Sequence, residues 1–244
     1  MPSSFVEEAS PAPGVALLRF APADRRGVLD TDAFSSLADF CAVAARREEL
    51  RVVLLRGAGP SLFAAGADLA EIAALTPEGA GPFADRARGT LAAWEALDAT
   101  TVVLVEGACF GGALDLVLCC DLVLAGPSAR FAHPGVARGI VTGWGGTSRA
   151  RRRLGEAALL HLFAEGEEVG AERALGSGLA DFAVPGPGEV EALALAVRWA
   201  GPAGDSLRDL KRVCRDVEGL PLPSALAVEE RTAELLRLGA RGRP

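Results

Sequence analysis

Two short loops of small residues could do chemistry with their backbone amides: AAGAD at residues 64–68 and FGGALD at residues 110–115. Each loop follows a predicted strand and directly precedes a predicted helix. Small side chains let the backbone approach a ligand closely, and N–H groups at a helix N-terminus are donors without a partner. Two such N–H groups facing each other would hold a carbonyl oxygen as it gains negative charge. The alternative is that both glycine turns are packing devices.

One carboxylate, Asp115, ends the second loop inside an apolar run, ACFGGALDLVLCCDLVLAG, at residues 108–126. A charge in such a run is unfavourable unless a partner neutralises it or a reaction requires it. Asp115 comes three residues after Gly112, and on a helix this spacing returns a side chain to nearly the same face. We therefore expect the carboxylate to lie near whatever the Gly112 N–H contacts. The alternative is a structural role, with Asp115 bonded to a nearby backbone N–H or arginine.

The elements that carry these loops alternate between strands and helices. Short apolar runs predict strands at residues 15–20, 52–55, 101–107, 121–126 and 178–184. Apolar residues at helical spacing predict helices at residues 31–49, 83–97 and 147–164. Thr31 or Asp32 is the expected N-cap of the first of these helices. This order predicts an α/β core followed by a helical C-terminal region.

Length, composition and charge limit the classes of protein to which the chain can belong. Its 244 residues suffice for one large α/β domain, and 50% of them are hydrophobic, as in a globular protein. The net charge of −7 argues against nucleic acid or an anionic membrane as the main partner. No apolar run reaches the roughly 18 residues of a membrane span, and the first ten residues do not resemble a signal peptide. We therefore expect a cytoplasmic protein with no membrane and no nucleic acid as partner.

The five cysteines and two histidines do not predict a metal site. Cys119 and Cys120 are adjacent rather than spaced as C-x-x-C, and most of the cysteines lie in apolar segments. Buried, reduced thiols in a cytosolic protein explain this usage best. We therefore expect no bound metal.

Four motifs, taken in their order along the chain, carry a family resemblance. They are LFAAGADLAEI, VEGACFGGALDLVLCCDLVLAG, ARFAHPGVARGIVTGWGGTSR and GLADFAV. Together they resemble the crotonase superfamily, also called the enoyl-CoA hydratase/isomerase family, over residues 15–200. The resemblance implies an α/β fold of the ClpP/crotonase-like class, a spiral of repeated ββα units within a core at residues 1–200. It also implies a C-terminal helical region at residues 201–244, shorter than usual for the family, and a homo-oligomer, either a trimer or a dimer of trimers.

The resemblance further implies an acyl-CoA thioester substrate and an enolate that is stabilised by two backbone N–H groups. The positions that match this oxyanion hole are Ala67 and Gly112. Asp115 matches a catalytic glutamate of the family's hydratases, which makes it the candidate general acid/base. Coenzyme A enters as part of the substrate, and no separate cofactor is expected. The neighbours expected to contact the substrate are Ala65, Asp68, Leu69 and Gly111.

The chain departs from the family's hydratases at a second catalytic position. Those enzymes carry another glutamate after the proline of ARFAHPGVARG, where this chain has Gly135. The first glutamate is shortened to Asp115, and a displacement of about 1 Å can lower a rate roughly 10²-fold. His133, two residues before the missing glutamate, is either a compensating acid/base group or a structural histidine. His161 lies in an amphipathic segment and is expected to be a packing or surface residue.

Three other residues concern substrate binding. Arg25 and Arg26 precede the first predicted helix, where the family has a basic residue near coenzyme A. The alternative is that both arginines are solvated on the surface. Trp144 stands in a glycine-rich loop where the family usually has a small residue, and it either narrows the acyl pocket or packs the loop.

The leading prediction is an enzyme that hydrates an enoyl-CoA or catalyses the reverse dehydration. Because only one of the two carboxylates is present, double-bond isomerisation or decarboxylation is the first alternative. A catalytically inactive acyl-CoA-binding protein is the second alternative. It is motivated by the missing glutamate and the short C-terminal region.

Overall fold

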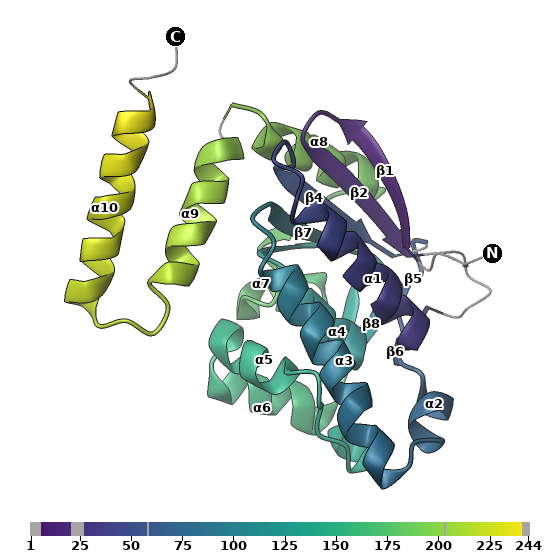
Figure 1. Ribbon diagram of the computed structural model, residues 1–244. Coiled ribbons are helices and arrows are strands. Elements are labelled where there is room, and N and C mark those ends of the chain that lie inside the picture. The colour runs from purple at the N-terminus through teal and green to yellow at the C-terminus, as the bar shows by residue number, and fades with distance from the viewer. Residues whose placement is uncertain (1–5, 21–26, 58, 203, 241–244) are drawn as a thin grey trace.

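A computed structural model describes residues 6–20, 27–57, 59–202 and 204–240 of the chain (Figure 1). Strands and helices alternate along most of it, as the sequence predicts. The strands are β1 (Val6–Ala12), β2 (Val15–Phe20), β3 (Val28–Leu29), β4 (Val52–Arg56), β5 (Leu62–Ala64), β6 (Gly66–Ala67), β7 (Thr100–Val105), β8 (Ala108–Phe110), β9 (Leu122–Ala125), β10 (Arg130–Ala132), β11 (Val169–Gly170) and β12 (Phe182–Ala183). The helices are α1 (Thr31–Ala44), α2 (Leu69–Ala73), α3 (Pro77–Glu95), α4 (Gly112–Val117), the 3₁₀ helix η2 (Val136–Arg138), α5 (Gly146–Leu154), α6 (Glu156–Glu165), α7 (Ala171–Ser177), α8 (Gly188–Ala200), α9 (Gly204–Asp216) and α10 (Leu222–Ala240).

The strands form three sheets in which most neighbours run parallel. The largest sheet has the order β1-β2-β4-β7-β9-β12, the second has the order β11-β10-β8-β5, and β3 pairs with β6. The pairs β1–β2 and β10–β11 are antiparallel. In each of the pairs β4–β5, β7–β8 and β9–β10, the first strand joins the six-stranded sheet and the second joins the four-stranded sheet. This repetition is the spiral of ββα units that the family resemblance implies.

The six-stranded sheet is apolar on both faces. Along β4, Val53 and Leu55 belong to the main core, which also contains buried residues of α1 and α3. The alternate residues Val52 and Leu54 belong to a second cluster with buried residues of α8. A strand buried on both faces reads as a continuous apolar run, which explains the VVLL pattern in the sequence.

Two helix boundaries differ from the sequence prediction. Helix α1 is capped by Asp30 rather than by either residue after it, since the Asp30 side chain accepts a hydrogen bond of 2.8 Å from the Ala33 N–H. The single helix expected at residues 147–164 is instead two helices, α5 and α6. Gly155 separates them with a φ of 80°, a conformation that glycine adopts without strain.

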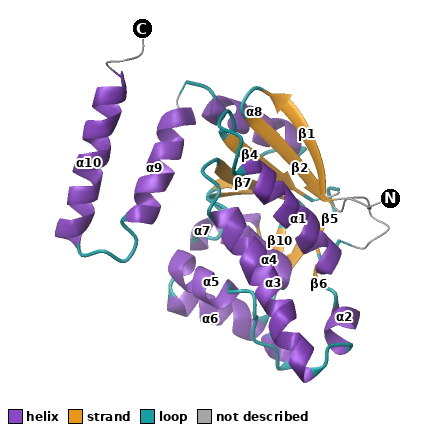
Figure 2. Cartoon of the chain, viewed as in Figure 1, coloured by secondary structure: helices purple, strands orange, loops and turns teal. Residues whose placement is uncertain are grey.

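The C-terminal helices α9 and α10 lie to one side of the strands (Figure 2). Ion pairs tie α9 to the core: Arg212 and Arg215 bind Asp98, and Lys211 binds Asp121. Helix α10 packs against α9. The division of the chain into a core and a C-terminal region at residue 200 stays a prediction. None of the helices in the described part of the chain combines the length and apolarity that crossing a membrane requires.

Candidate active site

A cavity of about 560 Å³ brings three distant segments of the chain together. Its lining comes from residues 65–84, 110–115 and 133–144. Because these segments follow strands of successive ββα units, the spiral stacks them beside one another. The volume is typical of small-molecule sites. The lining includes these residues singled out from the sequence: Ala65, Ala67, Leu69, Gly111, Gly112, Asp115, His133 and Trp144.

The two glycine loops meet at Gly66. Its φ is 89°, and a β-carbon there would lie 2.5 Å from the Phe110 carbonyl oxygen and 3.0 Å from the Gly112 nitrogen. Only glycine permits both this conformation and this approach. The next residue, Ala67, pairs with Leu29 through β6 and β3 and lines the cavity together with Gly112.

Helix α4 begins at Gly112, directly after β8. Its N-cap, Gly111, has φ 56° and ψ −124°, a backbone conformation that favours glycine. Amide hydrogens in the first turn of a helix have no acceptor within that helix. The Gly112 N–H is therefore a donor without a helical partner at the wall of the cavity.

Asp115 is completely buried on α4, and its two carboxylate oxygens have different surroundings. Oδ2 accepts a hydrogen bond from the Thr142 hydroxyl. Oδ1 lies 3.3 Å from Nε2 of His133, but among the described residues it makes no hydrogen bond. The distance permits an ion pair when the imidazole is protonated, whereas the two groups are not aligned as donor and acceptor. The carboxylate is thus held by a hydrogen bond at one oxygen, whereas the other is buried without a hydrogen bond from the described residues.

His133 is 4% exposed, and its ring stacks on Phe163 of α6 with the centroids 4.1 Å and the planes 7° apart. Within the described residues, neither ring nitrogen makes a hydrogen bond. Buried polar atoms are rarely left without a partner. One of the two alternatives drawn from the sequence is a structural histidine that forms hydrogen bonds in its loop. The described contacts of His133 include no such hydrogen bond.

The loop after His133 leaves little space for the glutamate that family hydratases carry. The Ile140 N–H donates to the Gly135 carbonyl oxygen at 2.9 Å, which closes the loop over η2. A β-carbon at Gly135 would lie 2.9 Å from the Ile140 carbonyl oxygen and 3.4 Å from two atoms of the His133 ring. A side chain at this position would therefore require the loop to shift.

Trp144 forms a wall of the cavity directly over Gly112. A β-carbon at Gly112 would lie 2.0 Å from Cζ3 of the indole ring. The tryptophan is 5% exposed, and its ring meets Phe34 edge-on at 4.8 Å and Phe83 at 6.0 Å between centroids. Trp144 therefore both packs its loop and bounds the cavity, the two roles that the sequence left open.

Asp68, another expected binding residue, is not among the described residues that line the cavity. The Asp68 side chain is the N-cap of α2 and accepts hydrogen bonds from two backbone N–H groups of that helix, at 2.8 and 3.4 Å. Arg25 and Arg26 lie outside the described residues. A cation that sequence reasoning did not single out, Arg138 of η2, does line the cavity.

Sequence reasoning also missed two residues that touch Asp115. Thr142 donates to its Oδ2, and a β-carbon at Gly146 would lie 1.7 Å from its Oδ1. Helix α5 can therefore begin beside the carboxylate only with a glycine. The available signal is the run TGWGG at residues 142–146, whose small residues indicate close packing but do not name the partner.

The cysteines near Asp115 are thiols rather than candidate nucleophiles. Burial raises the pKa of Cys109 well above its ordinary value, and the charges of Cys120 and Asp115 raise it further. Burial likewise raises the pKa of Cys119 well above that value and the pKa of Cys120 to about 12. In the part of the chain that the structure describes, no group of His, Cys, Asp and Glu is arranged to hold a metal ion.

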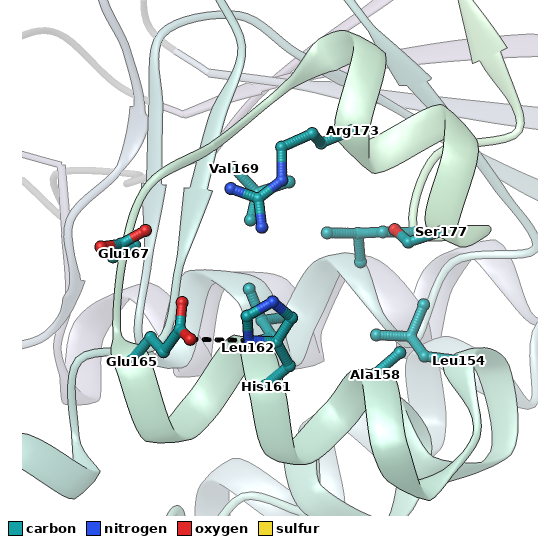
Figure 3. Close-up of a pocket in the computed structure, with 10 residues that line it drawn as sticks. Leu154, Ala158, His161, Leu162, Glu165, Glu167, Val169, Arg173 and Ser177 are labelled. Carbon is teal, nitrogen blue, oxygen red and sulfur yellow. Dashed lines mark ion pairs between the residues drawn. The ribbon is translucent and has the colours of Figure 1, made fainter.

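A second, smaller pocket of about 80 Å³ contains the other histidine of the chain. Figure 3 shows His161 beside Glu165 on α6, with Arg173 of α7 facing them. The His161 Nδ1 lies 3.0 Å from the Glu165 carboxylate, and the two side chains are 57% and 47% exposed. His161 is thus a surface residue that contacts Glu165 one helical turn away, in agreement with the sequence prediction.

Comparison with known proteins agrees with the resemblance. The family model described as "Enoyl-CoA hydratase/isomerase" matches residues 14–236. The chain is 32% identical over 183 residues to "Probable enoyl-CoA hydratase 2, mitochondrial" of Arabidopsis thaliana, and the match covers 74% of this chain but 60% of the relative. It is 31% identical over 212 residues to "2,3-dehydroadipyl-CoA hydratase" of Escherichia coli, covering 86% of this chain and 82% of the relative. The chain therefore spans less than two thirds of the plant relative's length.

A solved structure shows the same fold. The enoyl-CoA hydratase from Bacillus anthracis matches this chain with a TM-score of 0.89 and 27% sequence identity. The match covers 94% of this chain and 90% of that one. The crotonase fold predicted from the sequence motifs is confirmed.

Proposed function

This chain belongs to the enoyl-CoA hydratase/isomerase family, and we propose that it hydrates an enoyl-CoA thioester. One observation carries the proposal. Asp115 Oδ1 and both ring nitrogens of His133 are buried, lack hydrogen bonds among the described residues, and belong to a cavity that both glycine loops line. Leaving buried polar atoms unsatisfied is unfavourable by about 1–3 kcal/mol each, so the arrangement favours a bound water or ligand that hydrogen-bonds to them.

The thioester oxygen binds the N–H groups of Ala67 and Gly112 in this proposal. The close approach at Gly66 supports it, because it brings the first loop against the Gly112 nitrogen. Backbone donors held in this way stabilise an oxygen that becomes an anion in the transition state. Removing one such donor lowers kcat by about 10²–10³-fold in enzymes where this has been measured.

Asp115 and His133 transfer the protons when water adds to the double bond. Asp115 Oδ1 takes a proton from the water as the water oxygen bonds to the β-carbon, and the alkene electrons move onto the thioester oxygen. The α-carbon then receives a proton from the Asp115–His133 pair while the enolate returns to the thioester. Water is thereby added across the double bond, and the acid/base pair ends in its starting state.

The rest of the substrate meets an apolar wall and a cation. Trp144 bounds the acyl site over Gly112, and Arg138 is positioned at the lining to meet an anionic group of the substrate. The Escherichia coli relative is named for an enoyl-CoA substrate, which supports the same substrate class here. A contact of Arg25 and Arg26 with coenzyme A stays a prediction.

Assembly and location are parts of the same proposal. We expect a homo-oligomer, a trimer or a dimer of trimers, because family members assemble in this way. We also expect a cytoplasmic location, although the plant relative is named as mitochondrial.

A second candidate reaction is double-bond isomerisation, or another one-carboxylate enolate reaction such as decarboxylation. Among the described residues that line the cavity, Asp115 is the only carboxylate. One carboxylate suffices to take a proton from C2 of a 3-enoyl-CoA and return it to C4, which moves the double bond. This observation favours isomerisation over a two-carboxylate hydration mechanism.

Incubation with crotonyl-CoA in deuterated water tests the proposal, with the recovered thioester followed by mass spectrometry and NMR. Hydration produces 3-hydroxybutyryl-CoA that carries deuterium at C2. Deuterium at C2 or C4 without water addition indicates that the protein catalyses double-bond isomerisation instead. Binding of crotonyl-CoA with neither change contradicts catalysis on this thioester and favours the inactive acyl-CoA-binding protein.

A further inference from the structure

We propose that Thr142 is a positioning residue for Asp115, and that it makes Oδ1 the oxygen that exchanges protons. The inference rests on the proposed function, because it divides the acid/base role of Asp115 between its two oxygens. Two features of the loop at residues 142–146 and two features of Asp115 carry it. The first two are the direction of the Thr142 hydroxyl proton and the anchoring of the loop, and the other two are the contacts of the Asp115 carboxylate and the short side chain of aspartate.

The hydroxyl proton of Thr142 has a fixed direction. The Trp144 N–H donates to Thr142 Oγ1 at 3.2 Å, which occupies a lone pair of that oxygen. The hydroxyl in turn is hydrogen-bonded to Asp115 Oδ2. A backbone N–H can only donate, and in the ionised form that the proposed reaction requires the Asp115 carboxylate can only accept, so the threonine proton then points to Asp115. Thr142 is therefore a dedicated donor to this one oxygen.

The loop that carries Thr142 is anchored on both sides of Trp144. The indole ring lies on Gly112, and the Trp144 carbonyl oxygen accepts a hydrogen bond of 2.9 Å from Arg149 Nη1. Arg149 is itself held by Glu95 through two hydrogen bonds of 2.8 and 2.5 Å. The ring, the N–H and the carbonyl of Trp144 are all in contact. Because these contacts fix the loop, the Thr142 hydroxyl stays at a defined place.

The two carboxylate oxygens of Asp115 therefore differ in what they can do. Oδ2 is engaged with Thr142, whereas Oδ1 packs against Gly146 and lies 3.3 Å from His133 Nε2 without a hydrogen bond among the described residues. Without the Thr142 donor, no hydrogen bond of the described residues would stop rotation of the carboxylate about its last torsion. That rotation would move the reactive oxygen away from His133.

The short side chain of Asp115 makes this anchor more important. Aspartate is one methylene shorter than the glutamate of family hydratases and therefore reaches less far from α4. A misplacement of about 1 Å at a reacting group can lower a rate roughly 10²-fold. Fixing one oxygen from the opposite loop restricts the other oxygen to a single position.

Three substitutions in the full-length protein test the inference, with crotonyl-CoA as substrate. Thr142→Val keeps the shape of the side chain but removes the donor, Thr142→Ser keeps the donor but removes the methyl group, and Thr142→Ala is a second variant without a hydroxyl. We expect Thr142→Val and Thr142→Ala to lower kcat by about 10²-fold with KM unchanged. We expect Thr142→Ser to retain most of the wild-type kcat. Thr147→Val, at an exposed position of α5, is the matched control and keeps the wild-type kcat and KM.

The outcomes separate this inference from the proposed function. Wild-type kcat in Thr142→Val or Thr142→Ala overturns the inference, and so does an equal loss in Thr142→Ser, because the methyl group would then be what matters. A rise in KM at constant kcat also overturns it, since Thr142 would then act in substrate binding. Suppose that the wild type turns over crotonyl-CoA and Asp115→Asn does not. Wild-type kcat in all Thr142 variants would then refute this inference and leave the proposed function intact. If the wild type binds crotonyl-CoA but neither hydrates it nor exchanges deuterium, both fail.

Discussion

The two histidines of this chain stand beside carboxylates in opposite settings. His161 and Glu165 lie one turn apart on α6, are largely exposed, and need only the helix to bring them together. His133 directly follows β10, Asp115 lies on α4, both are buried, and they meet only because two ββα units are stacked. Exposed pairs contribute about 0.2–1 kcal/mol to stability, whereas each buried polar atom without a partner is unfavourable by about 1–3 kcal/mol.

The difference indicates which pair has a use beyond stability. The surface pair is explained by its neighbours on one helix, and its loss would change little. The buried pair places Asp115 Oδ1 and His133 Nε2 3.3 Å apart without a hydrogen bond, beside a cavity. An arrangement that does not stabilise the fold is what we expect of groups that act on a substrate.

Replacing the carboxylates gives the largest expected contrast. Asp115→Asn removes the proposed acid/base group, and we expect kcat for crotonyl-CoA hydration to fall about 10³-fold, within the range for loss of such a group. Glu165→Gln removes the surface carboxylate and leaves kcat unchanged. Steady-state kinetics on both variants measure the contrast. Equal activity of Asp115→Asn and wild type would refute the assigned role.

The next largest effect is expected when a neighbouring substitution displaces the Asp115 carboxylate and leaves Asp115 itself in place. A β-carbon at Gly146 would lie 1.7 Å from Asp115 Oδ1, so Gly146→Ala must push the carboxylate away, and we expect a loss in kcat of about 10²-fold. Gly176→Ala in α7 is the matched control, because a β-carbon there meets no atom within 4 Å. Thermal unfolding of both variants shows whether the fold is kept. A Gly146→Ala enzyme with full kcat would show that the position of Oδ1 is not critical.

Replacing the histidines sharpens the same contrast. We expect His133→Gln to lower kcat about 10²-fold, since the amide cannot take up and release a proton at neutral pH. His161→Gln removes an exposed pair and leaves kcat unchanged, with a loss in unfolding free energy below about 1 kcal/mol. Hydration rates and denaturant unfolding measure the two effects. If His133→Gln is fully active, Asp115 works alone and isomerase-like chemistry gains support.

The smallest effect belongs to Asp98, a partly exposed carboxylate between α3 and β7 that pairs with two arginines of α9. Hydrogen bonding to Arg212 lowers the pKa of Asp98 from 3.8 to about 2, with Arg215 adding to the shift against partial burial. The pKa is depressed in the folded protein, so the stabilisation is present above about pH 4 and is lost as the pH falls through about 2. We expect Asp98→Asn to destabilise by less than about 1 kcal/mol at neutral pH, because the side chain is 42% exposed.

Unfolding by denaturant between pH 2 and pH 7 measures this effect in wild type and Asp98→Asn. The difference in unfolding free energy between the two proteins should shrink as the pH falls. A difference that is constant over this range would contradict the ion pair as its source.

The sequence predicted the parts of the site that local pattern controls. Small residues between a strand and a helix marked the loops that carry Ala67 and Gly112, and the spacing from Gly112 placed Asp115 on the same helical face. The structure brings all three to one cavity. The apolar run of β4 likewise indicated a sheet covered on both faces, because burial on two sides leaves no polar alternation.

Contacts between distant units could not be predicted from the sequence. Nothing near Thr142 indicates that its hydroxyl meets α4, and nothing near Gly146 indicates that a carboxylate lies against it. The same limit applies to His133, whose two alternatives differ only in whether its ring nitrogens find partners in the folded chain. Local signals were also overridden at the N-cap of α1, where Asp30 competes with two equally suitable neighbours.

The spiral also determines when the cavity comes into existence during folding. Its three lining segments belong to successive ββα units, and no single unit contains more than one of them. Contacts between residues far apart in the sequence form slowly, since long loops must close before these contacts stabilise anything. A nascent or partly folded chain that has packed its first two units still lacks the loop that carries His133 and Thr142. Affinity for the proposed thioester substrate therefore depends on the completed native state, and a ligand that binds this state selectively draws the folding equilibrium toward it.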